Sequence, residues 1–459
     1  MKPRSWLQVI GGGIALIGII TAAFLFVLET RQSNIYFSII SFCIMPAIIG
    51  GGVMLYGIGA WLERRRERKL GADYQPQINL ALGEHRLAVG ISLGIAAAIL
   101  LPMSFYGSYQ AVHVVSSDRF CATACHNVME PEAVAHLHSP HASVSCTSCH
   151  IGPGAEHAIR AKFRGLHQLK AVLAGKFPRP VPSPVHSLRT PQDICGQCHD
   201  EGSLPKHTLK DYRFVLADDD NSVFQTRVLL KTAAIHAHPP TKYVADDPQR
   251  QTIPLVRVTR PDGSSETFTH EDEERAESAI LAQGLRGMDC IDCHNRPAHR
   301  FPTPQQQINA LFAAGKLPAL PNLKEHALAC FEADPSAFPQ ILSEAYGDSQ
   351  AAAEIAKASD ALAAAWRISH FPEMKVDWRS HPDNIGHSWS QGCFRCHDGR
   401  HESSAGKRIS ADCAICHDIV GQGPGLSLPP LGPPQTFKHP TDIAEMWQEM
   451  LCTECHNEE

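Results

Sequence analysis

The residues of this chain that are best suited to chemistry are cysteine pairs closed by a histidine. Six copies have the spacing Cys-x-x-Cys-His, and a seventh has one more residue between its cysteines. In chain order they are Cys121/Cys125/His126, Cys146/Cys149/His150, Cys195/Cys198/His199, Cys290/Cys293/His294, Cys393/Cys396/His397, Cys413/Cys416/His417 and Cys452/Cys455/His456. At this spacing two thiols bond to the vinyl groups of a haem, while the adjacent imidazole reaches its iron. The sequence therefore predicts seven covalently attached c-type haems.

Zinc ribbons and disulfide frameworks are the alternative explanations for so many cysteine pairs. Neither requires a histidine directly after the second cysteine. The seven motifs take 14 of the 16 cysteines, so both alternatives are set aside. Cys43 and Cys330 lie outside every motif and are expected to be buried packing residues.

A haem iron that only transfers electrons needs a second axial ligand besides the motif histidine. The chain has 26 histidines, and nine of them are candidates for this distal position. Five precede an attachment site by 5 to 13 residues, namely His141, His186, His387, His401 and His439. Four others compete for the isolated fourth haem, namely His167, His236, His238 and His299. Each of these four is explained equally well as a surface or structural histidine.

Three apolar runs in the first 117 residues are expected to hold the motifs beside a membrane. They cover about residues 6–28, 35–62 and 87–106, and each reaches the roughly 20 residues that a membrane-spanning helix needs. A cleavable signal peptide is the alternative for the first run, but two further runs follow it. The basic residues in 64–69, with Lys2 and Arg4, predict a cytoplasmic N-terminus. Three crossings then place the motifs on the periplasmic side of a bacterial cytoplasmic (inner) membrane.

The haem-bearing part is expected to be mainly helical and irregular and to pack around the porphyrins, because proline and glycine interrupt it throughout. Residues 339–368 are rich in alanine and predict helices, whereas residues 211–269 predict strands with a hairpin turn at 261–264. We therefore predict a membrane-anchored multihaem cytochrome with four parts. These are a three-helix anchor (1–117), a region with haems one to three (118–200), an insert with the β hairpin, haem four and the alanine-rich helices (201–389), and a C-terminal region with haems five to seven (390–459).

The charge of the part outside the membrane limits its partners. Residues 118–459 hold 42 Asp and Glu against 32 Lys and Arg, which excludes nucleic acid as the expected partner. An acidic surface of this kind favours a transient partner with a basic patch, although a merely solvated surface explains it as well.

Residues 121–150 resemble the N-terminal region of the NapC/NirT family of membrane-anchored multihaem quinol dehydrogenases. The shared pattern is an attachment site, a nearby methionine at Met129, the segment 138–141 (His-Ser-Pro-His) and a second attachment site. This chain has one extra residue between the first two cysteines and one more between His126 and Met129. Segments 287–297 and 384–399 resemble a longer subgroup, the seven-haem, three-span inner-membrane cytochromes of the metal-respiring type.

The resemblance implies a special first haem. In such relatives the methionine can bind the first iron in place of the motif histidine, and quinol binds on the open side near the membrane. By resemblance Met129 takes this role, with His126 as the competing ligand. Packing of Met129 against a porphyrin edge is the alternative.

Quinol oxidation also releases two protons, so the site needs proton acceptors. The family places a lysine shortly after the second attachment site, and Lys162 is the nearest match. The family's carboxylate seven residues later is absent, because residue 169 is leucine. Glu130, Asp118 or His113 is the expected substitute, against the alternative that each is an ordinary interfacial residue.

Taken together, the sequence predicts a heptahaem cytochrome that oxidises membrane quinol, similar to menaquinol, and passes single electrons to a periplasmic cytochrome or reductase. Its partners are then membrane lipid, the quinone pool and that acceptor. A relay subunit without its own quinone site is an alternative, and a terminal multihaem reductase is another. The sequence leaves open the direction of electron flow, and also whether the chain joins a larger membrane complex or a homo-oligomer.

Overall fold

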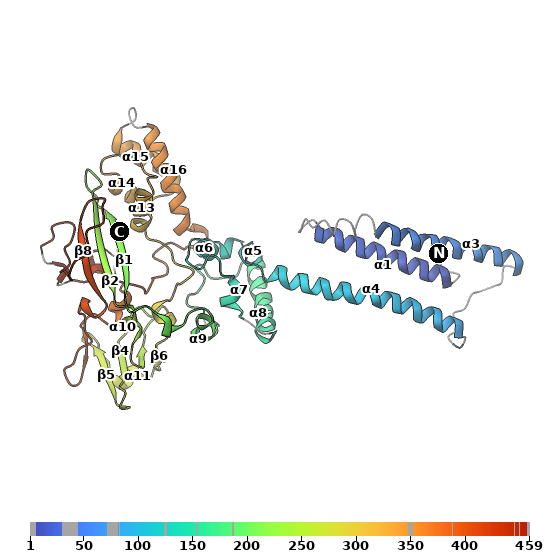
Figure 1. The fold of residues 1–459 in the computed structure, drawn as a ribbon, viewed down its shortest axis with the longest axis horizontal. Helices are drawn as coiled ribbons and strands as arrows, with labels where there is room; N and C mark the ends of the chain where they lie inside the picture. Colours follow the sequence, from blue (N-terminus) through green and yellow to red (C-terminus); the bar gives the residue numbers. More distant parts are fainter. Residues whose placement is uncertain are drawn as a thin grey trace. The chain divides into compact units, whose positions relative to one another are not determined.

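The computed structural model describes residues 6–29, 45–70, 81, 83–123, 126–152, 155–185, 188–347, 352–387, 389–444, 446–448 and 450–456. The chain divides into two compact units, Met1–Ser116 and Ser117–Glu459. Both are drawn in Figure 1. All of the haem motifs belong to the second unit.

In the described residues of the first unit there are three helices, α1 (Trp6–Glu29), α3 (Met45–Leu70) and α4 (Gly83–Val115). Helices α1 and α3 lie side by side and approach closely at glycines (Figure 1). A Cβ atom added to Gly11 would lie 2.6 Å from the carbonyl oxygen of Gly52, and one added to Gly52 would lie 2.8 Å from the carbonyl oxygen of Gly11. Small residues at such a contact are typical of helix pairs in membranes, where close backbone packing replaces the hydrophobic driving force.

The structure corrects the predicted number of membrane spans. Within the described ranges, two helices, not three, are long and apolar enough to cross a membrane, at Leu7–Leu25 and Met45–Lys69. The predicted third span, 87–106, lies inside α4, and many of its side chains fall outside the described residues. The predicted second span begins in residues 30–44, which also lie outside them, and α3 extends to Leu70 through the basic cluster.

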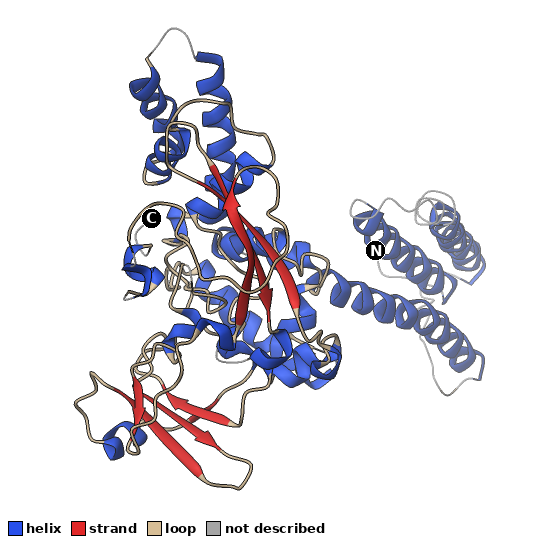
Figure 2. Cartoon of the chain, turned by 60° about the vertical axis from the view of Figure 1, so that its left-hand side comes forward, coloured by secondary structure: helices blue, strands red, loops and turns tan. Residues whose placement is uncertain are grey.

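The second unit is a mixture of short helices and two antiparallel sheets (Figure 2). Its α-helices are α5 (Asp118–Thr123), α6 (His126–Leu137), α7 (Cys146–His150), α8 (Ala155–Leu173), α9 (Pro191–Ile194), α10 (Thr232–His236), α11 (Glu277–Leu281), α12 (Cys290–Cys293), α13 (Pro304–Ala313), α14 (Leu323–Phe331), α15 (Phe338–Tyr346), α16 (Ala352–Ser369) and α17 (Cys452–Cys455). Its 3-10 turns are η2 (Cys195–Gln197), η3 (Glu201–Ser203), η4 (Pro335–Ala337), η5 (Pro372–Met374), η6 (Gly392–Arg395), η7 (Cys413–Ile415) and η8 (Met446–Gln448).

The strands form one sheet of order β1-β2-β8 and another of order β6-β3-β4-β5-β7. Their bounds are β1 (Thr208–Val215), β2 (Val223–Leu230), β3 (Thr241–Val244), β4 (Leu255–Thr259), β5 (Ser265–His270), β6 (Arg286–Gly287), β7 (His401–Ser403) and β8 (His417–Pro424). Residues 261–264, where the sequence predicts a turn, join β4 to β5, and Gly263 has the positive φ of +83° that such a tight turn requires. Because β7 and β8 follow residue 390, both sheets connect the predicted insert to the C-terminal region.

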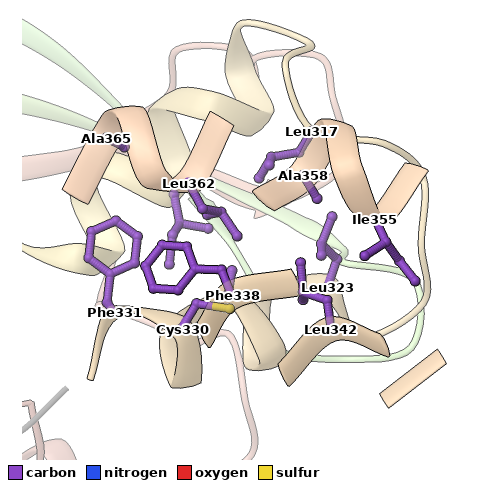
Figure 3. Close-up of a cluster of buried hydrophobic side chains, with 12 residues drawn as sticks. Leu317, Leu323, Cys330, Phe331, Phe338, Leu342, Ile355, Ala358, Leu362 and Ala365 are labelled. Carbon is purple, nitrogen blue, oxygen red and sulfur yellow. The ribbon is translucent and has the colours of Figure 1, made fainter. Parts of the chain in front are cut away.

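Helices α13 to α16 form a small bundle with its own apolar core. Phe338, Leu323, Leu342 and Leu362 are fully buried in it and come from helices α14, α15 and α16 (Figure 3). Cys330 is fully buried in the same core, which confirms its prediction as a packing residue. Cys43 lies outside the described residues.

Candidate haem-binding sites

Each regular motif folds into about one helical turn, which brings its two thiols to the same side of the chain. In four motifs the backbone N–H of the histidine donates to the carbonyl of the first cysteine, at 2.8 Å for His199 and His294, 3.0 Å for His397 and 2.9 Å for His456. This bond closes the turn between the first thiol and the imidazole. The local backbone therefore presents the two sulfur atoms and the ring together, as covalent haem attachment requires.

The motif cysteines differ in how far the chain covers them. Most of those that the structure describes are half-buried, but four are exposed, namely Cys198, Cys413, Cys452 and Cys455. An exposed thiol can still bond to a haem vinyl group, so each of the four remains a predicted attachment residue.

Cys198 in the third motif shows the physical reason for this exposure. It follows directly after the turn η2, where its backbone N–H donates to the Cys195 carbonyl at 3.1 Å, and only the short turn η3 comes next. So short a turn leaves the side chain at the surface. The thiol lies close to the second motif. Burial raises the pKa of Cys149 in that motif, and the nearby thiol of Cys198 raises this pKa further.

Every motif histidine of the six regular copies faces a second histidine from elsewhere in the chain. The distances between ring centroids are 6.0 Å for His150–His299, 6.0 Å for His199–His141, 6.2 Å for His294–His236, 5.9 Å for His397–His238, 6.1 Å for His417–His387 and 6.2 Å for His456–His439. The six separations agree within 0.3 Å, although the partners lie at very different distances along the sequence.

This common separation fits one iron between each pair of rings. With a metal–nitrogen distance of about 2 Å, and a ring centroid about 1 Å behind the nitrogen, imidazoles on opposite sides of a metal have centroids about 6 Å apart. Directly packed rings cover a wider range of separations, as in the pair His270–His401 at 5.1 Å. The residues present thus fit haem irons with two histidine ligands each.

Hydrogen bonds at the outer nitrogens fit the same assignment. Nδ1 lies 3.1 Å from the Pro297 carbonyl in His141, 2.7 Å from the Thr232 carbonyl in His236, 3.1 Å from the Glu132 carbonyl in His299 and 2.8 Å from the Thr441 carbonyl in His439. A carbonyl oxygen only accepts, so Nδ1 carries the proton and Nε2 keeps its lone pair. Histidines that bind metals usually donate from the other ring nitrogen in this way.

Two candidate distal histidines do not face any motif histidine whose side chain the structure describes, and a third candidate is not described. His401 is fully buried; its Nδ1 lies 3.0 Å from the Asp398 carboxylate and its Nε2 lies 2.8 Å from the Ile253 carbonyl. Both nitrogens are occupied, so His401 acts as a structural residue between β7 and the loop before β4. His167 lies exposed on α8, and His186 lies outside the described residues.

The sequence did not show which motif each histidine serves. His236, His238 and His299 were expected to compete for the fourth haem, yet they face the histidines of the fourth, fifth and second motifs respectively. His136, predicted to be an ordinary histidine, lies 6.3 Å from His299 and its Nε2 bonds the Val144 carbonyl at 2.9 Å. It flanks the second pair, and nothing in its sequence spacing distinguished it.

The fourth motif is anchored by the buried carboxylate of Asp292, which lies between its two cysteines. This carboxylate accepts hydrogen bonds from the Tyr243 hydroxyl at 2.6 Å, from Arg250 at 2.6 Å and from Arg286 at 3.0 Å. Burial raises the pKa of Asp292, but the hydrogen bonds of Arg286 and Tyr243 outweigh burial and leave the pKa below its usual value. The charged network fixes the motif to strands β3 and β6.

Comparison with known proteins supports the interpretation of these sites. Residues 84–181 match the family model described as the N-terminal region of the NapC/NirT cytochrome c family. The cytochrome c-type protein ImcH of Geobacter sulfurreducens (strain ATCC 51573 / DSM 12127 / PCA) is 31% identical over 466 residues, which cover 96% of this chain and 92% of ImcH. This chain belongs to the NapC/NirT cytochrome c family. It is a membrane-anchored multihaem cytochrome that transfers electrons. No solved structure matches it.

In this NapC/NirT cytochrome the first motif differs from the other six in spacing. Cys121 lies on α5, and Met129 lies half-buried on α6. Cys125 and the side chain of His126 lie outside the described residues. Beside this motif is a hollow of about 260 Å³, lined by Ala122, Glu130, Ala133, Val134 and Leu137. The lining is mostly apolar and contains one carboxylate.

The other predicted quinol-site residues are distributed over both units. Asp118 accepts a hydrogen bond from the backbone N–H of Cys146 at 2.7 Å, so its carboxylate is engaged in holding the second motif. His113 belongs to the first unit, where its Nε2 lies 3.0 Å from the Tyr109 hydroxyl. The side chain of Lys162 on α8 lies outside the described residues.

Proposed function

We propose that this chain oxidises a menaquinol-like quinol beside its first haem-binding site and passes single electrons through seven haems to a periplasmic cytochrome or reductase. The observation that carries the proposal is the set of six opposed histidine pairs. Two-sided ligation leaves the six regular sites suited to electron transfer rather than to substrate binding. Substrate contact then falls to the first motif, in the segment of the chain that matches the family's N-terminal region.

The overall reaction is the conversion of quinol to quinone with release of two electrons and two protons. When bound, haem iron supplies one-electron chemistry, so two electrons leave one at a time. Of the predicted proton acceptors, Glu130 lines the hollow beside the first motif. Asp118 is already bonded to the second motif, so Glu130 is the better proton acceptor among the described carboxylates.

The orientation in the membrane is part of the same proposal. The basic residues in 64–69 lie at the end of α3, and positive segments next to membrane helices remain in the cytoplasm. The proposed function requires the second unit to lie on the periplasmic side of the inner membrane. The acidic balance of residues 118–459 then faces the soluble electron acceptor.

The relay without a quinone site and the terminal reductase are the alternative functions. A terminal reductase needs an iron that is open to substrate, and the opposed histidines argue against such an iron at the six regular sites. A relay would accept electrons from a partner complex but not from quinol. Reduction by quinol therefore separates the relay from the proposed function.

The test mixes the purified oxidised protein with a menaquinol analogue and follows haem absorbance. Reduction by dithionite then measures the total amount of reducible haem. We expect quinol to reduce the wild type, and Met129→His and Glu130→Gln each to slow this reduction at least tenfold. Glu354→Gln on α16, an exposed glutamate of the haem-free bundle, is the matched control and should react like the wild type. Reduction of all haems by dithionite but of none by quinol would show that the chain is not a quinol dehydrogenase.

A further inference from the structure

The spatial order of the haem-binding sites follows from contacts between successive motifs. The backbone N–H of Cys146 donates to Asp118, three residues before Cys121, at 2.7 Å. This bond joins the first site to the second. His141, five residues before Cys146, faces His199 at 6.0 Å. The segment leading into the second motif therefore supplies the opposing ring of the third.

The third site is joined to the fourth, and the fourth to the fifth, by equally direct contacts. The outer nitrogen of His141 bonds the carbonyl of Pro297, three residues after His294, at 3.1 Å. The buried guanidinium of Arg395, between the cysteines of the fifth motif, donates to the Asp292 carbonyl at 2.6 Å. Asp292 has the same place in the fourth motif, so these two motifs are in direct contact.

One segment also serves both of these sites. His236 and His238 are two residues apart and face His294 of the fourth motif and His397 of the fifth motif respectively. The two iron positions must therefore lie on either side of this short segment.

The fifth site contacts the sixth through two rings. Nδ1 of His397 lies 2.9 Å from the carbonyl of Ser410, three residues before Cys413. Phe394 of the fifth motif stacks on His387, the partner of the sixth motif, with ring centroids 4.4 Å apart.

The sixth site contacts the seventh through the strand that follows its motif. Gln422 on β8 donates to the Thr436 carbonyl at 2.6 Å and accepts from the Lys438 N–H at 3.0 Å. Both bonds lie directly before His439, the partner of the seventh motif. Trp389, two residues after His387, also lies 6.2 Å from the His456 ring.

The segment after the fourth motif makes contacts that pass over the third site. His299 faces His150 of the second motif, and Arg296 pairs with Glu132, between the first and second motifs, at 3.3 Å. Five residues of extended chain reach up to about 17 Å, so this segment can reach back without placing the two motifs in contact.

We propose that the seven sites form a single unbranched row in chain order, with the C-terminal site, Cys452–His456, as the end from which electrons leave. The inference rests on the proposed function in one respect only, namely that electrons enter the row at the first site. Each transfer oxidises one ferrous site and reduces the next ferric one. At the last site a one-electron acceptor outside the chain takes the electron. A row has no bypass, so the loss of an interior site isolates every site beyond it.

The test compares two variants of the full-length protein that each lack one haem. Cys413→Ala/Cys416→Ala removes the sixth site, and Cys452→Ala/Cys455→Ala removes the seventh. Dithionite should reduce six haems in both. A menaquinol analogue should rapidly reduce six in the variant without the seventh site, but only five in the variant without the sixth. Rapid reduction of all six in both variants would overturn the row.

A second measurement keeps this inference independent of quinol oxidation. In electron paramagnetic resonance of the oxidised proteins, loss of the sixth site should narrow the coupled signals of two haems, the fifth and the seventh. Loss of the seventh site should change the signal of the sixth alone. Any other pattern of affected haems contradicts the row. If quinol fails to reduce the wild type while this pattern holds, the proposed function fails and the row remains.

Discussion

At the scale of single residues, histidines of similar sequence have different roles that follow from their free nitrogens. Four of the six opposing histidines donate from Nδ1 to a backbone carbonyl, which leaves Nε2 for a metal. His401 uses both nitrogens in hydrogen bonds and has none left. An iron ligand must keep one ring nitrogen free of hydrogen bonds to protein atoms, which excludes His401.

This difference predicts opposite results for His238 and His401. His238→Ala should convert one low-spin haem to high spin, because the fifth iron loses its second ligand. His401→Asn should leave all haems low-spin but lower the thermal midpoint, because a buried side chain loses a hydrogen bond worth about 1 kcal/mol. Absorbance and electron paramagnetic resonance of the oxidised proteins count the high-spin haems. A high-spin haem in His401→Asn would assign it as a ligand after all.

His381 predicts acid sensitivity of the second unit. It is only 6% exposed, and burial, followed by the charge of Arg296, lowers its pKa to about 4, with Glu132 and Asp377 opposing. The unfolded chain, with a pKa near 6.5, binds more protons below that pH than the folded chain does. Stability should therefore fall as pH decreases from about 6.5 to about 4, by up to about 3 kcal/mol from this group.

Calorimetry at pH 7.0 and pH 5.0 tests the acid sensitivity of His381. His381→Gln, which cannot be protonated, should lose less of its thermal midpoint between these two pH values than the wild type. An equal loss in both proteins would assign the acid sensitivity to other groups.

At the scale of elements, the helix pair of the membrane unit depends on two glycines. A side chain at Gly52 would collide with the backbone of α1, whereas Gly50, two residues earlier on α3, has nothing within 4 Å of its Cβ position. Gly52→Leu should separate the pair and lower the thermal midpoint of the unit in detergent, and Gly50→Leu should not. Circular dichroism during heating measures both variants. Equal midpoints would show that the contact does not stabilise the pair.

The elements also show how far sequence reasoning reaches. Alternating apolar residues and a Pro-Asp-Gly-Ser turn were enough to predict strands near β2 and β4 and the turn before β5, because these signals are local. The pairing of β2 with β8 joins residues about 200 positions apart and has no local signal. Likewise, all six opposing histidines are among the nine candidates. Their spacing in the sequence shows only that they could lie near a haem, and not which motif each of them faces.

At the scale of the whole molecule, the sheets, the charged network and the opposed rings connect segments that the sequence suggested as separate parts. Asp292 is bonded to side chains from strands β3 and β6 and, through its carbonyl, to Asn384 at 2.9 Å and to Arg395. The 201–389 and 390–459 regions therefore share buried polar contacts. A boundary drawn from the spacing of the motifs could not show this, because the contacts are made by side chains between the motifs.

The exchange of histidines between motifs also has a consequence for biogenesis and evolution. The second motif borrows His299 from beyond the fourth, and the third borrows His141 from before the second. A nascent chain that has emerged only as far as residue 200 would hold three attachment motifs, but the second would still await its opposing ring. Deletion or transplantation of the segment that carries His141, or of the segment that carries His299, would therefore remove the opposing ring of another motif.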